Sequence, residues 1–482
     1  MTRRTRSAFL PLLLALSMGA VPASARADST TVEIRPTASR FVGLVEFLRA
    51  TATDGRRGSA MRRLFDASGF ATVDSDARRR FGTLDLDAYT HTYEGYPSTH
   101  GHAAVGAWGS FVAAAAKSQG WDDLQDRTAG LFPNEVQGAI LEAMRDAEPA
   151  YDALVWTPYA GDVLNQVGAF SAYVGRHDLG AVVHRLATFY GSAWPDGLPL
   201  WVAFHPVPPR VGFGATVTGN VAVSQMPAGF DDYDVYASVA IHEVAHRLFA
   251  EQPAARAWWL RETMLAVDSP SRELAYRWLD EALATATSNG WVHAQLTGAL
   301  DAGAWYDDPI IEHYARALYP RVAGYLEAGR AIDEAFLRSA VATFEATFPE
   351  ALTDPDALLP YLSLVTDAGD GMDALLAPLH ERYRLRGTMM TNRFTDQALE
   401  SALGTPGLTV VVLADPTPEK DRLLRRHLPA TLMDTAGDVA YMVGPDGHPT
   451  LLVRAGGPEA LREALDRIAA GGLGPLLQRA AR

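Results

Sequence analysis

Hydrophobic positions follow a helical period along most of the chain and change to a strand period in a few short stretches. Apolar residues recur every three or four positions through much of 84–190 and 309–347, which indicates amphipathic helices. Between residues 198 and 227 the apolar positions alternate and Gly219-Asn220 offers a turn, so we expect a small antiparallel sheet. From residue 405 short apolar strands alternate with helical segments. The pattern predicts a mainly helical α+β protein.

Two helices are expected directly after this sheet. The first covers residues 231–251 and ends before Pro253, because proline cannot continue a helix. The second covers residues 270–288, with Ser269 as its cap and Asn289-Gly290 as its end.

The N-terminus has the three parts of a secretory signal peptide over residues 1–27. Three arginines among the first six residues make the start positive, an apolar run covers residues 8–20, and Ala-Ser-Ala at residues 23–25 offers a cleavage site. The apolar run is shorter than the roughly 20 residues that a membrane span needs. We therefore expect an exported protein, periplasmic or extracellular, with no stable membrane anchor after cleavage.

The composition excludes several classes of site and partner. The chain has no Cys, which rules out disulfides, Cys-ligated zinc, iron–sulfur clusters and a Cys nucleophile. Its net charge is −15, and such a chain lacks the positive charge with which nucleic-acid binders replace phosphate counterions. We therefore expect no nucleic-acid partner.

His242, Glu243 and His246 form the motif HExxH in the first of the two helices. Residues i and i+4 share one face of a helix, so both imidazoles can bind one Zn²⁺ ion. Glu243 is rotated by roughly 100° from His242 and can reach a zinc-polarised water without ligating the metal. Both His belong to an apolar stripe with Val235, Val239 and Phe249, where unpaired ring nitrogens are costly to bury. The motif predicts a zinc site, and the alternative is a pair of core His bonded to neighbours.

A third ligand is expected from the second helix. Glu281 shares a face with Trp278 and Thr285, and a carboxylate on such an apolar stripe needs a partner that a metal would provide. We therefore choose Glu281. The alternatives are Glu262, Glu273 and Asp280.

HExxH followed by a Glu on a later helix resembles the gluzincin clan of zinc metallopeptidases, in particular its secreted bacterial zinc-peptidase-like members. Phe249 and Gln252 stand where metzincins carry Gly and His, so that class is excluded. The resemblance covers roughly residues 198–330 and implies a zincin-like catalytic domain, mainly helical with a small antiparallel sheet. Thermolysin-like members carry an acid four residues after the ligand Glu, and here Thr285 has that place.

The resemblance also implies an oxyanion-stabilising group and a peptide-binding surface. Tyr306, at the entrance of a predicted helix, is our first choice for the oxyanion and His313 the second, whereas Tyr314 is expected in the core. Clan members bind peptides as an added strand along an exposed sheet edge. Residues 211–223 could serve that purpose or form an ordinary edge strand.

The chain is therefore expected to consist of five regions. They are a signal peptide, a mostly helical N-terminal region, a zincin-like catalytic core, a helical connection and a small C-terminal α/β unit, over residues 1–27, 28–197, 198–350, 351–404 and 405–482. We expect an exported zinc metallopeptidase that hydrolyses peptides or proteins, with Glu243 as its general base. A non-catalytic exported binding protein and a zinc hydrolase of a non-peptide substrate are the alternatives.

Overall fold

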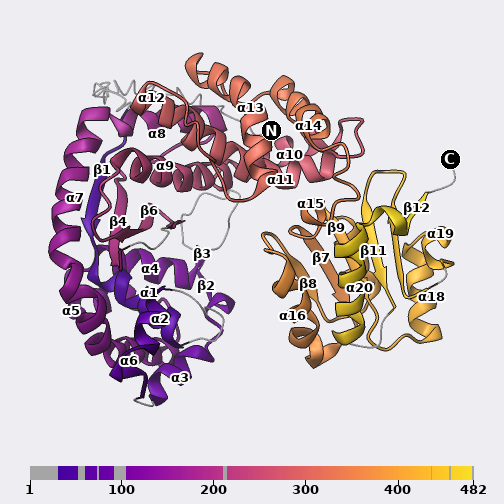
Figure 1. Cartoon of the computed structure of the whole chain (residues 1–482), viewed down its shortest axis with the longest axis horizontal. Coiled ribbons are helices and arrows are strands. Elements are labelled where there is room, and N and C mark those ends of the chain that lie inside the picture. The colour runs from indigo at the N-terminus through magenta and orange to yellow at the C-terminus, as the bar shows by residue number, and fades with distance from the viewer. Residues whose placement is uncertain are drawn as a thin grey trace, which may run out of the picture. The chain divides into compact units, whose positions relative to one another are not determined.

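The computed structural model describes residues 31–52, 60–72, 75–91, 105–209, 214–435, 437–454 and 458–479. The predicted signal peptide lies outside these residues. From Thr31 onward the chain forms one compact unit. It is mostly helical, with mixed sheets (Figure 1), which confirms the α+β class. No helix among the described residues is both long and apolar enough to cross a membrane.

Helices dominate the N-terminal part, as the periodicity predicts. The elements are β1 Ile34–Ala38, α1 Arg40–Ala52, α2 Ala60–Asp66, α3 Asp76–Gly82, α4 Ala107–Lys117, α5 Trp121–Thr128, α6 Asn134–Tyr151, α7 Thr157–His177 and α8 Leu179–Tyr190. A separate hydrophobic cluster around Phe47, Phe111 and Tyr151 joins α1, α4 and α6. Burial of such aromatic side chains stabilises this region.

A four-stranded sheet among the described residues carries β1 beside three strands from the region predicted to be a sheet. These are β4 Leu200–Val207, β5 Ala215–Thr218 and β6 Val221–Pro227, in the order β1-β4-β6-β5. β5 and β6 form the predicted antiparallel hairpin, and Gly219 in its turn has a φ of 57°. Residues 211–213 of the predicted strand lie outside the described part.

The prediction of a wholly antiparallel sheet is wrong. β4 runs parallel to both β1 and β6. β5 turns back at the sheet edge, so that β6 points the same way as β4 and pairs with it. Alternating apolar positions predict strands but do not reveal their relative direction.

The helices that follow the sheet are α9 Tyr233–Ala250, α10 Ala254–Leu265, α11 Arg272–Thr285, α13 Pro309–Glu327 and α14 Glu334–Thr347. α9 begins two residues after the predicted start, because the Asp232 carboxylate caps it by accepting a hydrogen bond from the Val235 backbone N–H at 3.1 Å. The predicted cap of the next helix is wrong. The Ser269 hydroxyl accepts from the Ser271 N–H in the turn before α11 begins.

The predicted end of α11 at Asn289-Gly290 is also wrong. The chain continues through a π-helical turn, Ala286–Val292, into α12, His293–Thr297. Gly290 does not end the helix but lets it pack closely on α13, since a Cβ there would lie 2.6 Å from Cδ2 of Tyr319. Glycine therefore serves packing here, which the sequence pattern does not distinguish from a helix stop.

A second, six-stranded sheet forms the C-terminal part, with the order β12-β10-β11-β9-β7-β8. Its strands are β7 Leu362–Thr366, β8 Met389–Thr391, β9 Leu408–Val412, β10 Val439–Val443, β11 Pro449–Val453 and β12 Leu477–Arg479. The main connecting helices are α16 Met372–Arg382, α17 Asp396–Leu403, α18 Pro418–His427 and α20 Pro458–Gly471. β7, β8, β9 and β11 are parallel, and β10 is antiparallel to β11.

The strands expected after residue 405 are present, but the helical prediction for residues 351–404 is wrong in part. β7 and β8 come from this stretch and belong to the same sheet. β7 is a fully buried strand of five residues that include Ser363 and Thr366, and periodicity alone cannot tell so short a mixed segment from a helix.

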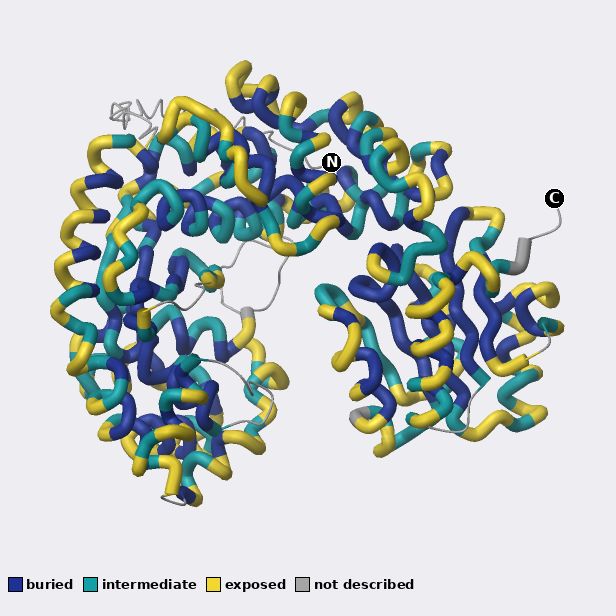
Figure 2. Tube along the Cα trace, viewed as in Figure 1, coloured by how far each residue is buried: buried dark blue, intermediate teal, exposed yellow. Residues whose placement is uncertain are grey.

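One continuous hydrophobic core joins α9 and α11 to one face of the six-stranded sheet. It includes Ile241 of α9, Trp278 of α11 and Leu364 of β7. The Trp278 indole N–H donates to the carbonyl oxygen of Ala357 at 2.9 Å. Buried residues predominate along the central strands of this sheet (Figure 2). α11 therefore has packing partners on both sides, which fixes the position of its side chains.

Candidate metal centre

Helix α9 presents both His of HExxH on a half-buried face. Its fully buried face consists of other residues, among them Ile241, Val244 and Leu248. The apolar stripe expected to carry the two His is not the core-facing side, since Val235 and Val239 are only half-buried. The buried face anchors the helix, which leaves His242 and His246 directed toward α11.

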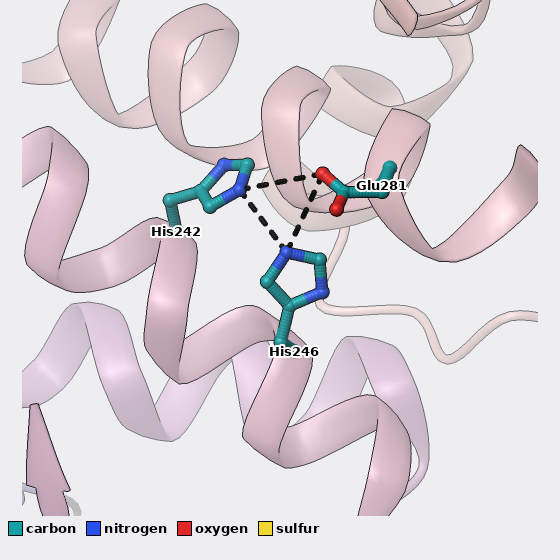
Figure 3. Close-up of side chains that lie close together, drawn as sticks. All are labelled: His242, His246 and Glu281. Carbon is teal, nitrogen blue, oxygen red and sulfur yellow. Dashed lines mark hydrogen bonds and ion pairs between the residues drawn. The ribbon is translucent and has the colours of Figure 1, made fainter. Parts of the chain in front are cut away.

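Three ligand atoms converge between α9 and α11. Nε2 of His242 and Nε2 of His246 are 3.1 Å apart. Oε2 of Glu281 lies 3.7 Å from the first nitrogen and 3.6 Å from the second. Figure 3 shows the two imidazoles, from one helix, and the carboxylate, from its neighbour, pointing toward one another. Of the acidic residues considered, the structure places Glu281 beside both Nε2 atoms.

The triangle fits the ligand sphere of zinc. Zn–N and Zn–O bonds of about 2.0–2.2 Å in a tetrahedron place neighbouring ligand atoms roughly 3.3–3.6 Å apart, close to the three distances above. Oε2 of Glu281 is a buried polar atom that accepts no hydrogen bond from any described residue. A buried carboxylate oxygen without a donor is costly, and a cation shared with the two imidazoles would satisfy it. Among the described residues this is the group of His and carboxylates that could hold a metal ion.

Two further side chains orient the imidazoles through their other ring nitrogen. Nδ1 of His246 lies 3.1 Å from Oδ1 of Asp280, and Nδ1 of His242 lies 3.3 Å from the Ser288 hydroxyl oxygen. Ser288 itself donates to the carbonyl oxygen of Ala284 at 2.7 Å, so its oxygen can accept from His242. With the proton on Nδ1, each Nε2 offers its lone pair to a metal.

Thr285, which stands where thermolysin-like members carry an acid, supports neither His. Its side chain is fully buried, and its hydroxyl oxygen finds no hydrogen-bond partner in the part of the chain that the structure describes. Ser288 supports His242 instead. The π-helical turn after α11 shifts the positions of its residues around the helix axis and so brings Ser288 opposite His242.

Arg386 is a residue of the site that the sequence does not indicate. It follows α16, and its side chain is 7% exposed. Its guanidinium lies 3.4 Å from Oε1 of Glu281 and 3.0 Å from Oδ2 of Asp308, and it donates to the Tyr306 hydroxyl oxygen at 3.4 Å. Arg386 therefore neutralises one oxygen of Glu281 while the other faces the two His.

Tyr306 lies beside the metal centre, whereas the second choice for the oxyanion does not. The ring centroids of Tyr306 and His242 are 6.1 Å apart. His313 is exposed on α13. Tyr314 is fully buried and donates to the Ala340 carbonyl oxygen, which confirms its predicted core position.

The other acidic candidates have different partners. Glu262 pairs with Arg261 at 2.5 Å. Oε2 of Glu273 lies 2.9 Å from Nδ1 of the buried His448 and accepts from the Gly407 N–H at 3.0 Å. Asp280 contacts the outer nitrogen of His246, so it is placed as a support of a ligand.

Burial and charge set the protonation of the centre. Burial alone would raise the pKa of Glu281, but its two imidazole neighbours hold it well below its ordinary value. Burial opposes the charged form of His246, yet Asp280 and Glu281 outweigh it and raise the pKa of His246 strongly. Burial lowers the pKa of His242. In the absence of a cation the pair therefore holds a proton on His246 opposite an ionised Glu281.

Glu243 faces a cavity of about 600 Å³ that also exposes His246 and Glu281. Burial raises the pKa of Glu243 to about 7, which is close to the value that suits a general base at neutral pH. Thr216 and Val217 of the edge strand β5 line the same cavity. This space is thus bordered by two metal ligands, by a carboxylate suited to proton transfer and by the edge strand of the described sheet.

No family model matches the chain, and comparisons with curated proteins and with solved structures found no match either.

Proposed function

We propose that the protein is a zinc-dependent hydrolase of the gluzincin type that cleaves peptide bonds. The observation that carries this proposal is the convergence of the two His Nε2 atoms and the donor-free Oε2 of Glu281 at separations of 3.1–3.7 Å. His242, His246 and Glu281 would hold the ion. The signal-like N-terminus supports export of the enzyme.

The remaining residues have roles that follow from their positions. Zinc, when bound, polarises a carbonyl group and lowers the pKa of water. Glu243 accepts the proton of the attacking water and passes it to the leaving amine. Asp280 and Ser288 keep both imidazoles in the tautomer that offers Nε2. Tyr306 accepts from Arg386, so its own hydroxyl hydrogen is available to an oxygen that develops negative charge.

The position of β5 supports a peptide as the substrate. β5 ends the four-stranded sheet and pairs with β6 on one side. Its residues Thr216 and Val217 border the cavity that holds Glu243 and His246. An extended peptide could add to this edge through backbone hydrogen bonds, which would place its carbonyl groups beside the metal centre.

Three variants test the proposal. Zinc content is measured by elemental mass spectrometry, and hydrolysis is measured on a mixed peptide library. Glu243→Gln should keep about one zinc per chain and lose turnover by at least 100-fold, because it removes the general base alone. His246→Ala should lose the zinc. Glu262→Gln, which removes a rival carboxylate away from the centre, should keep both zinc and turnover.

Two results would contradict the proposal in different ways. Zinc-replete protein without bound zinc would remove the metal centre and favour the exported binding protein. Zinc retained by the wild-type protein with no cleavage in the library would favour a hydrolase of a non-peptide substrate.

A further inference from the structure

Three arginines line the cavity beside the metal centre, and they differ in their partners. Arg247 pairs with Glu251 at 2.6 Å, and Arg386 pairs with Glu281 and Asp308. Arg277 of α11 lies within ion-pair distance of no carboxylate among the described residues, although it lines the same cavity. One positive charge beside the proposed catalytic carboxylates is therefore in direct contact with no described carboxylate, and Glu273 acts on it only at longer range.

The surroundings of Arg277 position the guanidinium but do not neutralise it. Its Nε is buried and has no hydrogen-bond partner in the described part of the chain. Nη2 donates to the Gly387 carbonyl oxygen at 3.3 Å, and the guanidinium carbon lies 5.2 Å from the centre of the Tyr361 ring. Burial lowers the pKa of Arg277, but an arginine stays charged in a protein. A half-buried and unpaired guanidinium is costly to maintain, so we look for an anion that it binds.

Arg277 lies close enough to the centre to contact a bound substrate. It precedes Glu281 by one helical turn on the same face of α11. The cavity that it lines is continuous with Glu243, His246 and the edge strand residue Thr216. A ligand lying along β5 beside the metal centre would thus have Arg277 within the same space.

We propose that Arg277 binds a carboxylate of the substrate, so that the enzyme selects peptides with a carboxylate near the scissile bond. This inference rests on the proposed function and names the substrate class of that site. A guanidinium N–H donates a strong, charge-assisted hydrogen bond to a carboxylate. Nη1 of Arg277 donates to none of the described residues, whereas the buried Nε is out of reach of a ligand. The carboxylate is the free C-terminus of the peptide or an Asp or Glu side chain.

Calorimetric binding to zinc-loaded Glu243→Gln protein tests the inference without requiring turnover. The probes are short peptides of one sequence, made with a free C-terminal carboxylate or a C-terminal amide, and with Glu or Gln beside the central bond. We expect the carboxylate form to bind roughly 10- to 100-fold more tightly than its neutral counterpart. The pair of peptides that shows this preference identifies the source of the carboxylate.

Substitution of Arg277 decides whether that preference depends on it. In the same Glu243→Gln background, Arg277→Gln should reduce the affinity ratio to about 1, and Arg277→Lys should keep part of it because the charge remains without the planar fork. Arg338→Gln, which removes an exposed arginine paired with Glu334 on α14, should leave the ratio unchanged. Circular dichroism checks that each variant is folded, and Arg277→Lys carries the test if Arg277→Gln does not fold.

Two outcomes would overturn the role of Arg277. A carboxylate preference that persists in Arg277→Gln would place the anion elsewhere. An equal loss of affinity for the charged and neutral peptides would show that Arg277 only positions the Gly387 segment. Neither outcome would affect zinc content, whereas failure of the proposed function would appear as missing zinc or as missing turnover in the wild-type protein.

Discussion

His246 is the residue whose protonation changes most when a metal binds. Asp280 lies at its Nδ1 and Glu281 faces its Nε2, and together they raise its pKa strongly in the metal-free protein. A zinc ligand must be unprotonated at Nε2, so the ion and the proton compete for the same atom. The site therefore binds zinc more weakly as pH falls.

We predict that zinc binding at pH 8 releases about one proton, and that zinc affinity rises up to about tenfold per pH unit while His246 is protonated in the free protein. The sign follows because the free form holds a proton that the zinc-bound form lacks. At pH 8 Glu243, with a pKa of about 7, is already mostly ionised. Titration calorimetry in buffers of different ionisation enthalpy counts the protons.

Asp280→Asn provides the matched test of this electrostatic argument. The amide keeps the shape of the side chain but removes the charge that stabilises protonated His246. Proton release at pH 8 should therefore decrease, and the intrinsic zinc affinity should fall by roughly 10- to 100-fold because the outer support of the ligand is weaker. Unchanged proton release would show that Asp280 does not set the pKa of His246.

Arg386 is a buried cation that pairs with Glu281 and Asp308. Arg386→Gln leaves Glu281 and Asp308 without their buried cation, which should lower the free energy of unfolding of zinc-free protein by about 3 kcal/mol. It should also weaken zinc binding, since Glu281 loses an orienting partner. Urea unfolding with a chelator and zinc titration measure the two effects.

Arg384→Gln is the control, because the side chains of Arg384 and of its partner Asp307 are 64% and 78% exposed. We expect it to change stability by less than about 1 kcal/mol. Equal effects of the two substitutions would mean that burial does not distinguish these ion pairs.

The sequence predicts the site residues that lie on one helix or on nearby helices of the chain. HExxH places His242, Glu243 and His246 by helical spacing alone, and the stripe on the next helix leads to Glu281. The support by Arg386 is not predictable in this way, because 105 residues separate it from Glu281. Many arginines are present in the chain, so the residue type gives no signal either.

The π-helical turn after α11 contributes both to the metal centre and to the packing of the helices. It carries Ser288, the partner of His242, and it packs on α13 through Gly290. Gly290→Ala should lower the free energy of unfolding by about 1–3 kcal/mol, because the new Cβ would lie 2.6 Å from Tyr319 and 3.0 Å from Trp305. The zinc affinity of Gly290→Ala should fall as well, because a shift of the turn moves Ser288 relative to His242. Chemical unfolding and zinc titration test both effects.

Gly175→Ala is the matched control in an ordinary helix. Gly175 lies inside α7, and its Cβ would meet nothing within 4 Å among the described atoms. Alanine has the higher helix propensity, so this variant should be about 0.5–1 kcal/mol more stable than the wild-type protein. Similar destabilisation of both variants would contradict the packing role of Gly290.

Helices and strands could be predicted where the hydrophobic period is distinctive. They could not be predicted where packing against other elements determines the structure. The amphipathic helices and the β5–β6 hairpin follow from spacing and turn residues. The parallel pairing of β4 with β6 depends on the position of β5 at the edge, which no local pattern records. β7 is buried on both faces, its polar residues Ser363 and Thr366 included, so it lacks the regular alternation that identifies a half-exposed strand.

In the whole molecule, α11 connects the metal centre to the C-terminal sheet. Trp278 bonds to the Ala357 carbonyl oxygen and Arg277 to that of Gly387, while Glu273 contacts His448. Each of these residues lies on the helix that also carries Glu281. The hydrophobic core is continuous across the same boundary. Loss of the sheet would thus expose one side of the helix that supplies a metal ligand.

Chains of this length often unfold in several steps, one part after another. Because α9, α11 and the six-stranded sheet share one hydrophobic core, we expect these elements to unfold together. Leu452 of β11 is fully buried in a separate cluster of the C-terminal part, so Leu452→Ala should cost about 2–5 kcal/mol. If the two parts open together, hydrogen exchange measured by mass spectrometry will show protection in α9 and α11 falling by the same free energy as in β9 and β11. The exposed Leu300→Ala should alter neither. Unchanged protection of α9 in Leu452→Ala would instead show that the metal-site helices are stable without the sheet. Arg386 would then contact Glu281 from a part of the chain that folds independently.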